Sequence, residues 1–232
     1  MAAEKIDLSK YLHERYLERN APLLNPGPVV TISREMGCPG KKISQLLQDA
    51  LNRHAQKDMK KPEWKWVSKE IFESAAKELD LEPERIIEAF KHPRGIIDEI
   101  IHSQSKKYYV NDRRIRKTIG EVIRSMANDG HVIILGRGGV ALTRDIPKSL
   151  HISLEAPLDW RAALVSEKHC MSIPDAKKYI KEIDERRAQY RAYYQGKNND
   201  YTSFDVRFNC MSLSLSEIVD VIIKIMEIRK LI

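Results

Sequence analysis

Short runs of hydrophobic residues alternate with segments of helical periodicity along most of the chain. The β-branched run 29–33 predicts a buried strand, and apolar residues recur at three- and four-residue spacing over 41–54, as in a helix. Further strands are predicted at 64–67, 131–135, 150–154 and 204–208, and further helices at 175–194 and 216–228. Strands separated by helices favour an α/β fold with a five-stranded parallel sheet covered by helices on both faces.

The remaining segments suggest a main domain with an extension. Residues 1–24 have the pattern of an amphipathic helix and end at the linker Asn25-Pro26-Gly27-Pro28, which stops regular structure. We therefore expect an N-terminal helical extension over 1–24 and one domain over 25–232, a length that suits a single large α/β domain. Within it, 69–128 is helical in pattern with a break near 92–95.

Composition narrows the setting of the protein. No segment reaches the roughly 18 consecutive apolar residues of a membrane span, and the N-terminus does not resemble a signal peptide. The three cysteines, Cys38, Cys170 and Cys210, are too few and too scattered for a disulfide framework or a zinc site. We therefore expect a cytoplasmic protein without a membrane partner.

The net charge of +7 suits a polyanionic partner, either nucleic acid or phosphorylated metabolites. Basic residues gather at 105–117 and 177–191, but acidic residues are interspersed in the second cluster. No recognition module or pattern of stacking aromatic residues accompanies the charge, so a nucleic-acid partner is the least favoured alternative.

The turn between the first strand and helix carries candidate chemistry. Gly37, Gly40 and Lys41 provide a strand–turn–helix in which backbone N–H groups, a helix N-terminus and a lysine can surround a phosphate. The usual loop pattern has a glycine where this chain has Glu35, and a magnesium-binding hydroxyl where it has Lys42. Ser44 is the nearest hydroxyl downstream and the only metal-ligand candidate.

Five short motifs resemble, in order, those of the cytidylate kinase-like family of P-loop kinases. They are Ser33-Arg34-Glu35-x-Gly37-x-x-Gly40-Lys41, Gly136-Arg137-Gly138, Ala156-Pro157-Leu158-Asp159-Trp160-Arg161, Asp184-x-x-Arg187-x-x-Tyr190 with Tyr193-Tyr194-x-Gly196, and Phe204-Asp205-Val206-x-Phe208-Asn209. The resemblance implies a three-layer α/β/α P-loop kinase fold, with a helical acceptor-binding lobe at about 68–128 and a lid at about 166–196.

The resemblance also implies roles for individual residues. The donor nucleotide and its phosphates would contact Ser33, Arg34, Gly37, Cys38, Pro39, Gly40, Lys41, Lys42 and Ile43. Lys41 would be the leading catalytic cation, with Arg161 and Arg187 closing over the phosphates from the lid. The acceptor would contact Ser68, Arg137, Gly138, Asp184 and Arg187. Arg34 has two interpretations, because it either packs over the loop or binds a phosphate.

The function implied is transfer of a phosphoryl group from ATP, with Mg²⁺, to a nucleoside monophosphate, with CMP or dCMP as the first expectation. Ser68 stands where the family usually has aspartate, which leaves open a kinase of another small acceptor. The missing loop glycine and hydroxyl leave open a nucleotide-binding regulator without turnover. The sequence does not define an oligomeric state.

Overall fold

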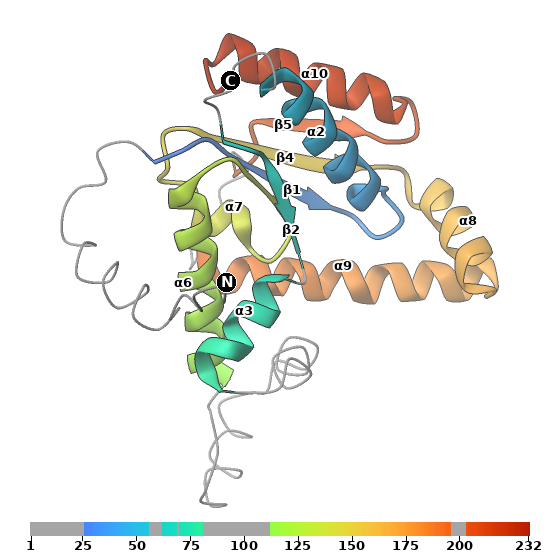
Figure 1. Ribbon diagram of the computed structural model, residues 1–232. Helices are drawn as coiled ribbons and strands as arrows, with labels where there is room; N and C mark the ends of the chain where they lie inside the picture. Colours follow the sequence, from blue (N-terminus) through green and yellow to red (C-terminus); the bar gives the residue numbers. More distant parts are fainter. Residues whose placement is uncertain (1–25, 56–61, 69, 81–111, 196–202) are drawn as a thin grey trace, which may run out of the picture.

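The computed structural model describes residues 26–55, 62–68, 70–80, 112–195 and 203–232 (Figure 1). The described strands are β1 (Val29–Arg34), β2 (Lys65–Val67), β3 (Val132–Leu135), β4 (Ser149–Glu155) and β5 (Val206–Asn209). The described helices are α2 (Gly40–Ala55), α3 (Glu70–Leu79), α6 (Asp112–Asp129), α7 (Gly139–Leu142), α8 (Leu158–His169), α9 (Ile173–Gln195) and α10 (Leu215–Ile228). The expected helix over 1–24 and the expected break near 92–95 lie outside the described residues.

The five strands form one parallel sheet in the order β2-β3-β1-β4-β5, which confirms the fold class predicted from the sequence. Val30 pairs with Ile133 on one side of β1 and with Leu150 on the other, so β1 lies at the centre. The carboxyl ends of all strands therefore meet at one edge of the sheet. Ligands of open parallel sheets bind outside that edge.

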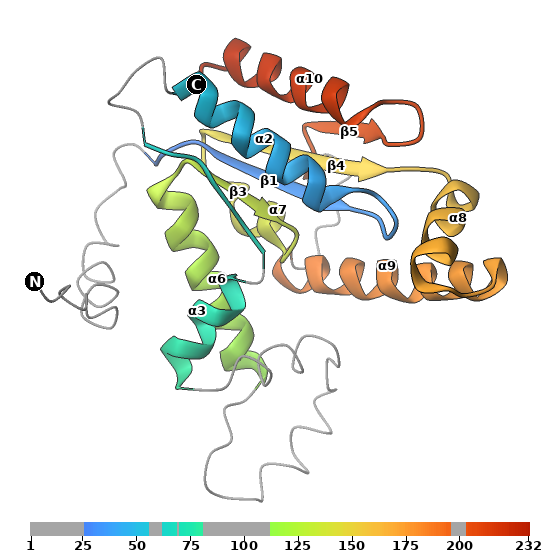
Figure 2. The ribbon, with the colours of Figure 1, turned by 45° about the vertical axis from the view of Figure 1, so that its right-hand side comes forward.

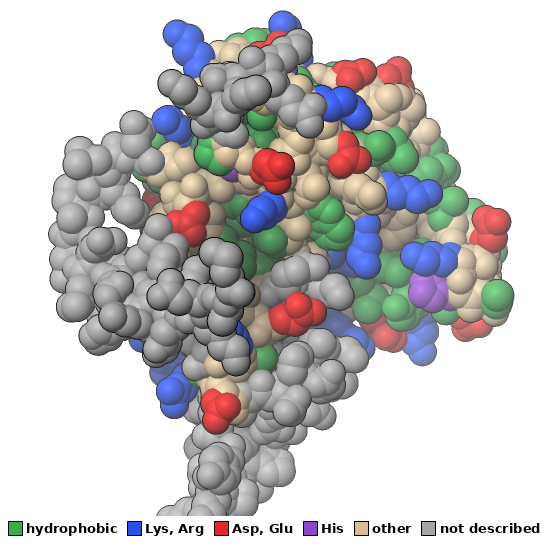
Figure 3. Space-filling model, in the orientation of Figure 1, with side chains coloured by type: hydrophobic (Ala, Val, Ile, Leu, Met, Phe, Trp, Pro, Cys, Tyr) green, Lys and Arg blue, Asp and Glu red, His purple; other side chains and the backbone are tan. Residues whose placement is uncertain are grey.

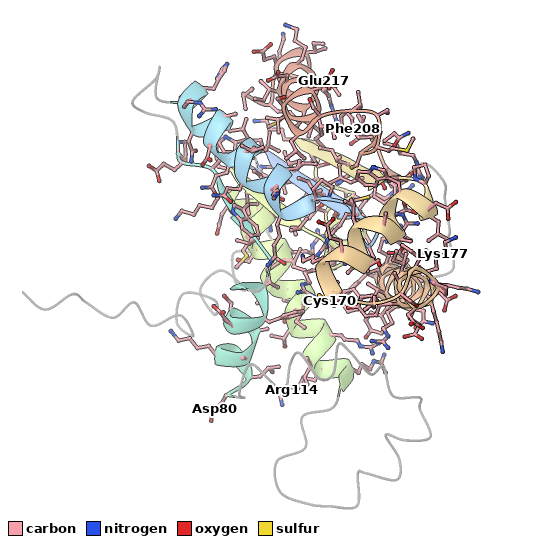
Figure 4. All side chains as sticks on the ribbon, turned by 90° about the vertical axis from the view of Figure 1, so that its right-hand side faces the viewer. Asp80, Arg114, Cys170, Lys177, Phe208 and Glu217 are labelled. Atoms are coloured by element: carbon pink, nitrogen blue, oxygen red, sulfur yellow. The ribbon has the colours of Figure 1, made fainter. Side chains whose placement is uncertain are left out.

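Two hydrophobic layers hold helices against the sheet. On one face, side chains such as Ile32 and Ile152 pack with α2 and α10, and on the other Val29 and Ile134 pack with α3 and α6. A smaller cluster joins α8 to α9 around Ala162 and Ile180. Figures 1 and 2 show these layers, with α9 running along the carboxyl edge of the sheet beneath the β1–α2 loop. Asp80, after α3, and Glu217, in α10, lie at opposite sides of the molecule (Figure 4).

Some elements differ from the prediction in extent. The last strand begins at Val206 instead of 204, and the first helix of the pair α8–α9 was not predicted at all. The buried residues of α8 are only Arg161, Ala162 and Val165, so no continuous apolar stripe marks it in the sequence. Helix α7 has four residues, which is too short for periodicity to reveal. Ser214 is the N-cap of α10 and completes a capping box with Glu217.

One face of β4 carries the buried polar side chains of Ser149, His151 and Ser153. His151 Nδ1 lies 2.8 Å from Thr31 Oγ1, and Nε2 lies 3.1 Å from Ser149 Oγ. Both ring nitrogens therefore have a hydroxyl partner when the ring is neutral. Burial lowers the pKa of His151, and the nearby Asp205 carboxylate opposes that shift. The folded state thus disfavours the protonated ring.

This burial predicts an acid-sensitive fold. Because the pKa of His151 is lower in the folded than in the unfolded chain, the unfolded state binds more protons as the pH falls below about 6.5, and stability decreases. The contribution has an upper limit of about 1.4 kcal/mol per pH unit. Urea unfolding at about pH 7.5 and about pH 5.5 should show a smaller loss for His151→Asn than for the wild type. Equal losses would contradict the assignment to His151.

Candidate active site

The β1–α2 loop, residues 35–39, joins the centre of the sheet to the N-terminus of α2. Gly37 has φ of 99°, and a Cβ atom built there would lie 3.0 Å from Arg161 Cβ, so both conformation and space require glycine. Ile43 N donates to Pro39 O at 3.1 Å, which begins the helix. The loop therefore turns sharply enough to direct the N-terminus of α2 toward the carboxyl edge.

The start of α2 offers unsatisfied donors. Over the described residues, the backbone N–H groups of Lys41 and Lys42 donate to no protein acceptor, as expected for the first turn of a helix. Both side chains are exposed. The positive end of the helix dipole adds to these N–H groups and to the two lysine charges. This combination is suited to binding an anion such as a phosphate.

Beneath the loop lies Arg161, which is 7% exposed and held from several sides. Its Nη1 donates to Met36 O at 3.1 Å and to Asp184 Oδ2 at 2.7 Å, and its Nε donates to Ala156 O at 2.9 Å. Glu35 Oε2 lies 3.3 Å from the same Nε. Arg161 thus joins the loop, the β4–α8 connection and α9, and its contacts hold it under the loop.

Glu35 and Asp184 complete this support. Glu35 Oε2 accepts a hydrogen bond from Ala156 N at 3.0 Å, which gives a physical reason for a glutamate where a glycine is usual. Asp184 Oδ1 accepts a hydrogen bond from Met36 N at 2.7 Å, so both Asp184 oxygens are engaged by the loop and Arg161. The β1–α2 loop is therefore held by two carboxylates and one guanidinium.

Arg187 approaches the loop from the same helix. Its Nη1 donates to Arg34 O at 2.9 Å, and Nη2 lies 3.8 Å from Met36 Sδ. Burial lowers the pKa of Arg187, and the charge of Asp184 opposes that shift. Figure 3, drawn in the orientation of Figure 1, shows basic side chains on this face where the β1–α2 loop approaches α9.

Cys38 and Ser44 face inward. Ser44 is fully buried, and its hydroxyl donates to Gly40 O at 2.9 Å, so it is turned away from the loop's outer surface. The thiol of Cys38 packs against that of Cys210, and this hydrogen bond together with burial raises the pKa of Cys38. The raised pKa favours the neutral thiol, which is less nucleophilic than a thiolate.

The turn after β3 is built from three consecutive residues in the left-handed region. Gly136, Arg137 and Gly138 have φ of 75°, 58° and 70°. A non-glycine residue in such a conformation costs about 1–2 kcal/mol, and Arg137 adopts it between two glycines. The Arg137 guanidinium lies 3.9 Å from the centroid of the Phe72 ring, which ties the turn to α3.

The C-terminal half of α9 packs against this turn. A Cβ atom on Gly138 would lie 2.7 Å from Tyr194 Cδ2, so only glycine allows the ring to approach. Tyr194 Oη donates to Arg116 O at 2.7 Å and lies 2.9 Å from Tyr190 Oη. These contacts pack the tyrosines of α9 against α6 and the turn before α7, which favours a packing role for both side chains.

The structure brings most of the expected site residues to one edge of the sheet. The loop follows β1, Ser68 follows β2, Arg137 follows β3, and Asp184 and Arg187 come from α9. Ser68 is buried at that edge. Arg161 contacts the loop at Met36 O, and Asp184 contacts it at Met36 N. The expected lid over about 166–196 consists, as far as residue 195, of the end of α8, a turn with Cys170 in the left-handed conformation, and the continuous helix α9 (Figure 4).

Glu35 and Met36 are site residues that the sequence did not identify by role. The signal for Glu35 was its presence where a glycine is expected, and its partner Ala156 is 121 residues away. Met36 contributes only its backbone and sulfur, which no motif reveals.

Several solved structures are similar to this chain. An uncharacterized protein from Eubacterium ventriosum ATCC 27560 has a TM-score of 0.57 at 20% identity, over 86% of this chain and 98% of that one. Shikimate kinase from Bacteroides thetaiotaomicron has a TM-score of 0.47 at 11% identity, over 86% and 98% of the two chains. Shikimate kinase from Acinetobacter baumannii, in complex with shikimate, has a TM-score of 0.48 at 9% identity, over 91% and 100%. No curated protein matches significantly.

The first of these structures shares the fold of this chain. The model of the cytidylate kinase-like family matches residues 29–211. The chain belongs to the cytidylate kinase-like family, as the sequence motifs predicted. Family membership implies a phosphotransferase that uses ATP, usually together with Mg²⁺. In the described residues, no helix is long and apolar enough to cross a membrane.

Proposed function

We propose that this protein transfers the γ-phosphoryl group of ATP to a nucleoside monophosphate, with CMP or dCMP as the preferred acceptor. The observation that carries the proposal is the convergence of the phosphate loop, Arg137 and Arg187 at one edge of the sheet. Phosphoryl transfer needs donor and acceptor in line and positive charge around the transferred group, and no covalent enzyme intermediate.

The donor phosphates would bind the N–H groups at the start of α2, with Lys41 adding charge. Arg137 would bind the acceptor phosphate through its planar guanidinium, which makes two parallel hydrogen bonds where a lysine cannot. Ser68, at the same edge, would contact the acceptor. The region about 68–128 would form the acceptor-binding lobe, and the α8–α9 region the lid.

We assign Arg161 and Asp184 a positioning role. Their contacts with Met36 fix the loop that would hold the donor, so they would act through that loop. Arg187 donates to the carbonyl oxygen of Arg34 at the end of β1 and would contact both the transferred phosphoryl group and the acceptor phosphate. A fixed loop lowers the reorganisation needed when charge develops in the transition state.

Magnesium would enter with the nucleotide. Ser44 does not fit a metal ligand, because its hydroxyl is fully buried and bonded to Gly40 O. Mg²⁺ in such enzymes is held largely by substrate phosphates and water, and it would neutralise phosphate charge when bound. The same feature of Ser44 favours one alternative, a nucleotide-binding regulator without turnover. The substituted Ser68 favours the other, a kinase of a different small acceptor.

A panel of acceptors separates these three functions. With ATP and Mg²⁺ present, ADP release should be fastest with CMP or dCMP and should fall to background in an acceptor-free control. Fastest release with a non-nucleotide acceptor would establish the other kinase. Tight ATP binding with no ADP formed for any acceptor would establish the regulator.

A further inference from the structure

Arg34, the last residue of β1, spans the two halves of the site. A Cβ atom on Gly40 would lie 3.2 Å from Arg34 Cγ, so the stem of Arg34 lies on the first residue of α2. A Cβ atom on Gly136 would lie 1.9 Å from Arg34 Nη1, so the guanidinium lies directly on that glycine, beside Arg137. Arg34 therefore places a charge between the phosphate loop and the turn after β3.

Within the described part of the chain, this charge has no counter-ion. Across the described residues, the Arg34 guanidinium makes no ion pair and donates no hydrogen bond. Two other arginines lie nearby. Arg187 donates to the Arg34 carbonyl oxygen, and Arg137 follows Gly136 in the chain. Burial, together with the smaller effects of the Arg187 and Arg137 charges, lowers the pKa of Arg34 to about 9. In the ligand-free protein the charges of Arg187 and Arg137 thus disfavour the charged form of Arg34, while Arg187 itself has the Asp184 carboxylate 3.8 Å away.

A buried charge without a partner is unfavourable, and a bound anion removes that penalty. Resting on the proposed function, we propose that Arg34 joins Arg137 and Arg187 in binding the acceptor's phosphate dianion, and that Arg34 thereby selects phosphorylated acceptors over neutral alcohols. An acceptor without a phosphate would leave Arg34 unpaired. A site whose buried donors stay unpaired rejects such a ligand far more strongly than a hydrophobic pocket would.

Binding measurements without turnover test this selection. Calorimetry would compare CMP with cytidine on the full-length protein, with the phosphate loop filled by a non-hydrolysable ATP analogue. In Arg34→Met, CMP binding should weaken by about ten- to a hundredfold, while cytidine binding stays unchanged. The affinity for the ATP analogue should change by less than about threefold. Arg53→Met, an exposed arginine of α2, is the control for loss of one positive charge and should bind CMP as the wild type does.

Two further readouts separate ligand binding from a structural role. Arg34→Met should raise the ligand-free Tm, because it removes a repelled charge, whereas loss of a structural arginine would lower it. Arg34→Lys keeps the charge without the planar fork and should bind CMP with intermediate affinity. If Arg34→Met does not fold, the CMP affinity of Arg34→Lys tests the role of Arg34 instead.

The outcomes separate this inference from the proposed function. Arg34-dependent CMP binding without turnover would leave the inference standing and remove the proposed function. If Arg34→Met turns over with an unchanged acceptor KM, the proposed function stands and the inference about Arg34 is wrong. A wild type that binds CMP no better than cytidine, or an Arg34→Met variant that weakens the ATP analogue as much as CMP, would overturn the inference.

Discussion

Asp184→Asn should destabilise the fold by about 2–4 kcal/mol and lower phosphoryl transfer at the same time, because it leaves Arg161 buried without its closest carboxylate. Met36 N and Arg161 each donate to one oxygen of Asp184. The asparagine amide would place an N–H donor against one of these two donors. Urea unfolding monitored by circular dichroism, together with steady-state kinetics, measures the two effects on one preparation.

The matched control is Glu182→Gln, which removes one negative charge from the exposed side of the same helix. Its partner Arg186 is 3.9 Å away on the surface, so stability should change by less than about 0.5 kcal/mol and activity should not change. A different result for Asp184→Asn, with wild-type stability and a raised acceptor KM, would contradict the positioning role and place Asp184 against the acceptor.

Arg137→Gly should strongly reduce transfer while leaving the fold intact. The substitution relieves a left-handed backbone that costs about 1–2 kcal/mol and removes a cation–π contact of about the same size, so the net change in stability should be below about 1 kcal/mol. Loss of the guanidinium should lower kcat/KM by about a hundred- to a thousandfold, as when a donor to developing charge is removed.

His131→Gly is the matched control for this prediction. His131 also has a left-handed backbone, with φ of 52°, but it precedes β3 at the opposite edge of the sheet. Its substitution relieves the same strain and should leave kcat/KM unchanged. Arg137→Gly activity within threefold of the wild type would remove Arg137 from the proposed acceptor site.

The fold was predictable where burial is continuous. The run Val29–Ser33 and the helix that begins near Lys41 carry unambiguous patterns, and the alternation of such units defines a parallel sheet. Helix α8 was not predicted, because its buried face contains an arginine whose partners belong to other elements. A hydrophobic pattern cannot reveal a face that is buried by ion pairs and hydrogen bonds.

The members of the site were predictable from the motifs, but their contacts were not. The sequence indicates that Arg161 and Asp184 belong near phosphate, yet only tertiary structure shows that they bond to Met36, 125 and 148 residues away. Arg34 had two interpretations in sequence. Its position on Gly40 and Gly136, beside two other arginines, is what distinguishes them physically.

The most direct test of the proposed function is the transfer of label from [γ-³²P]ATP to CMP by the wild type and by Lys41→Ala. Lys41 is exposed at the first turn of α2, so its substitution should leave the fold intact. We predict labelled CDP from the wild type and a rate lower by about a hundredfold or more in Lys41→Ala. Absence of labelled acceptor from the wild type, or equal rates from the two proteins, would contradict phosphoryl transfer at this loop.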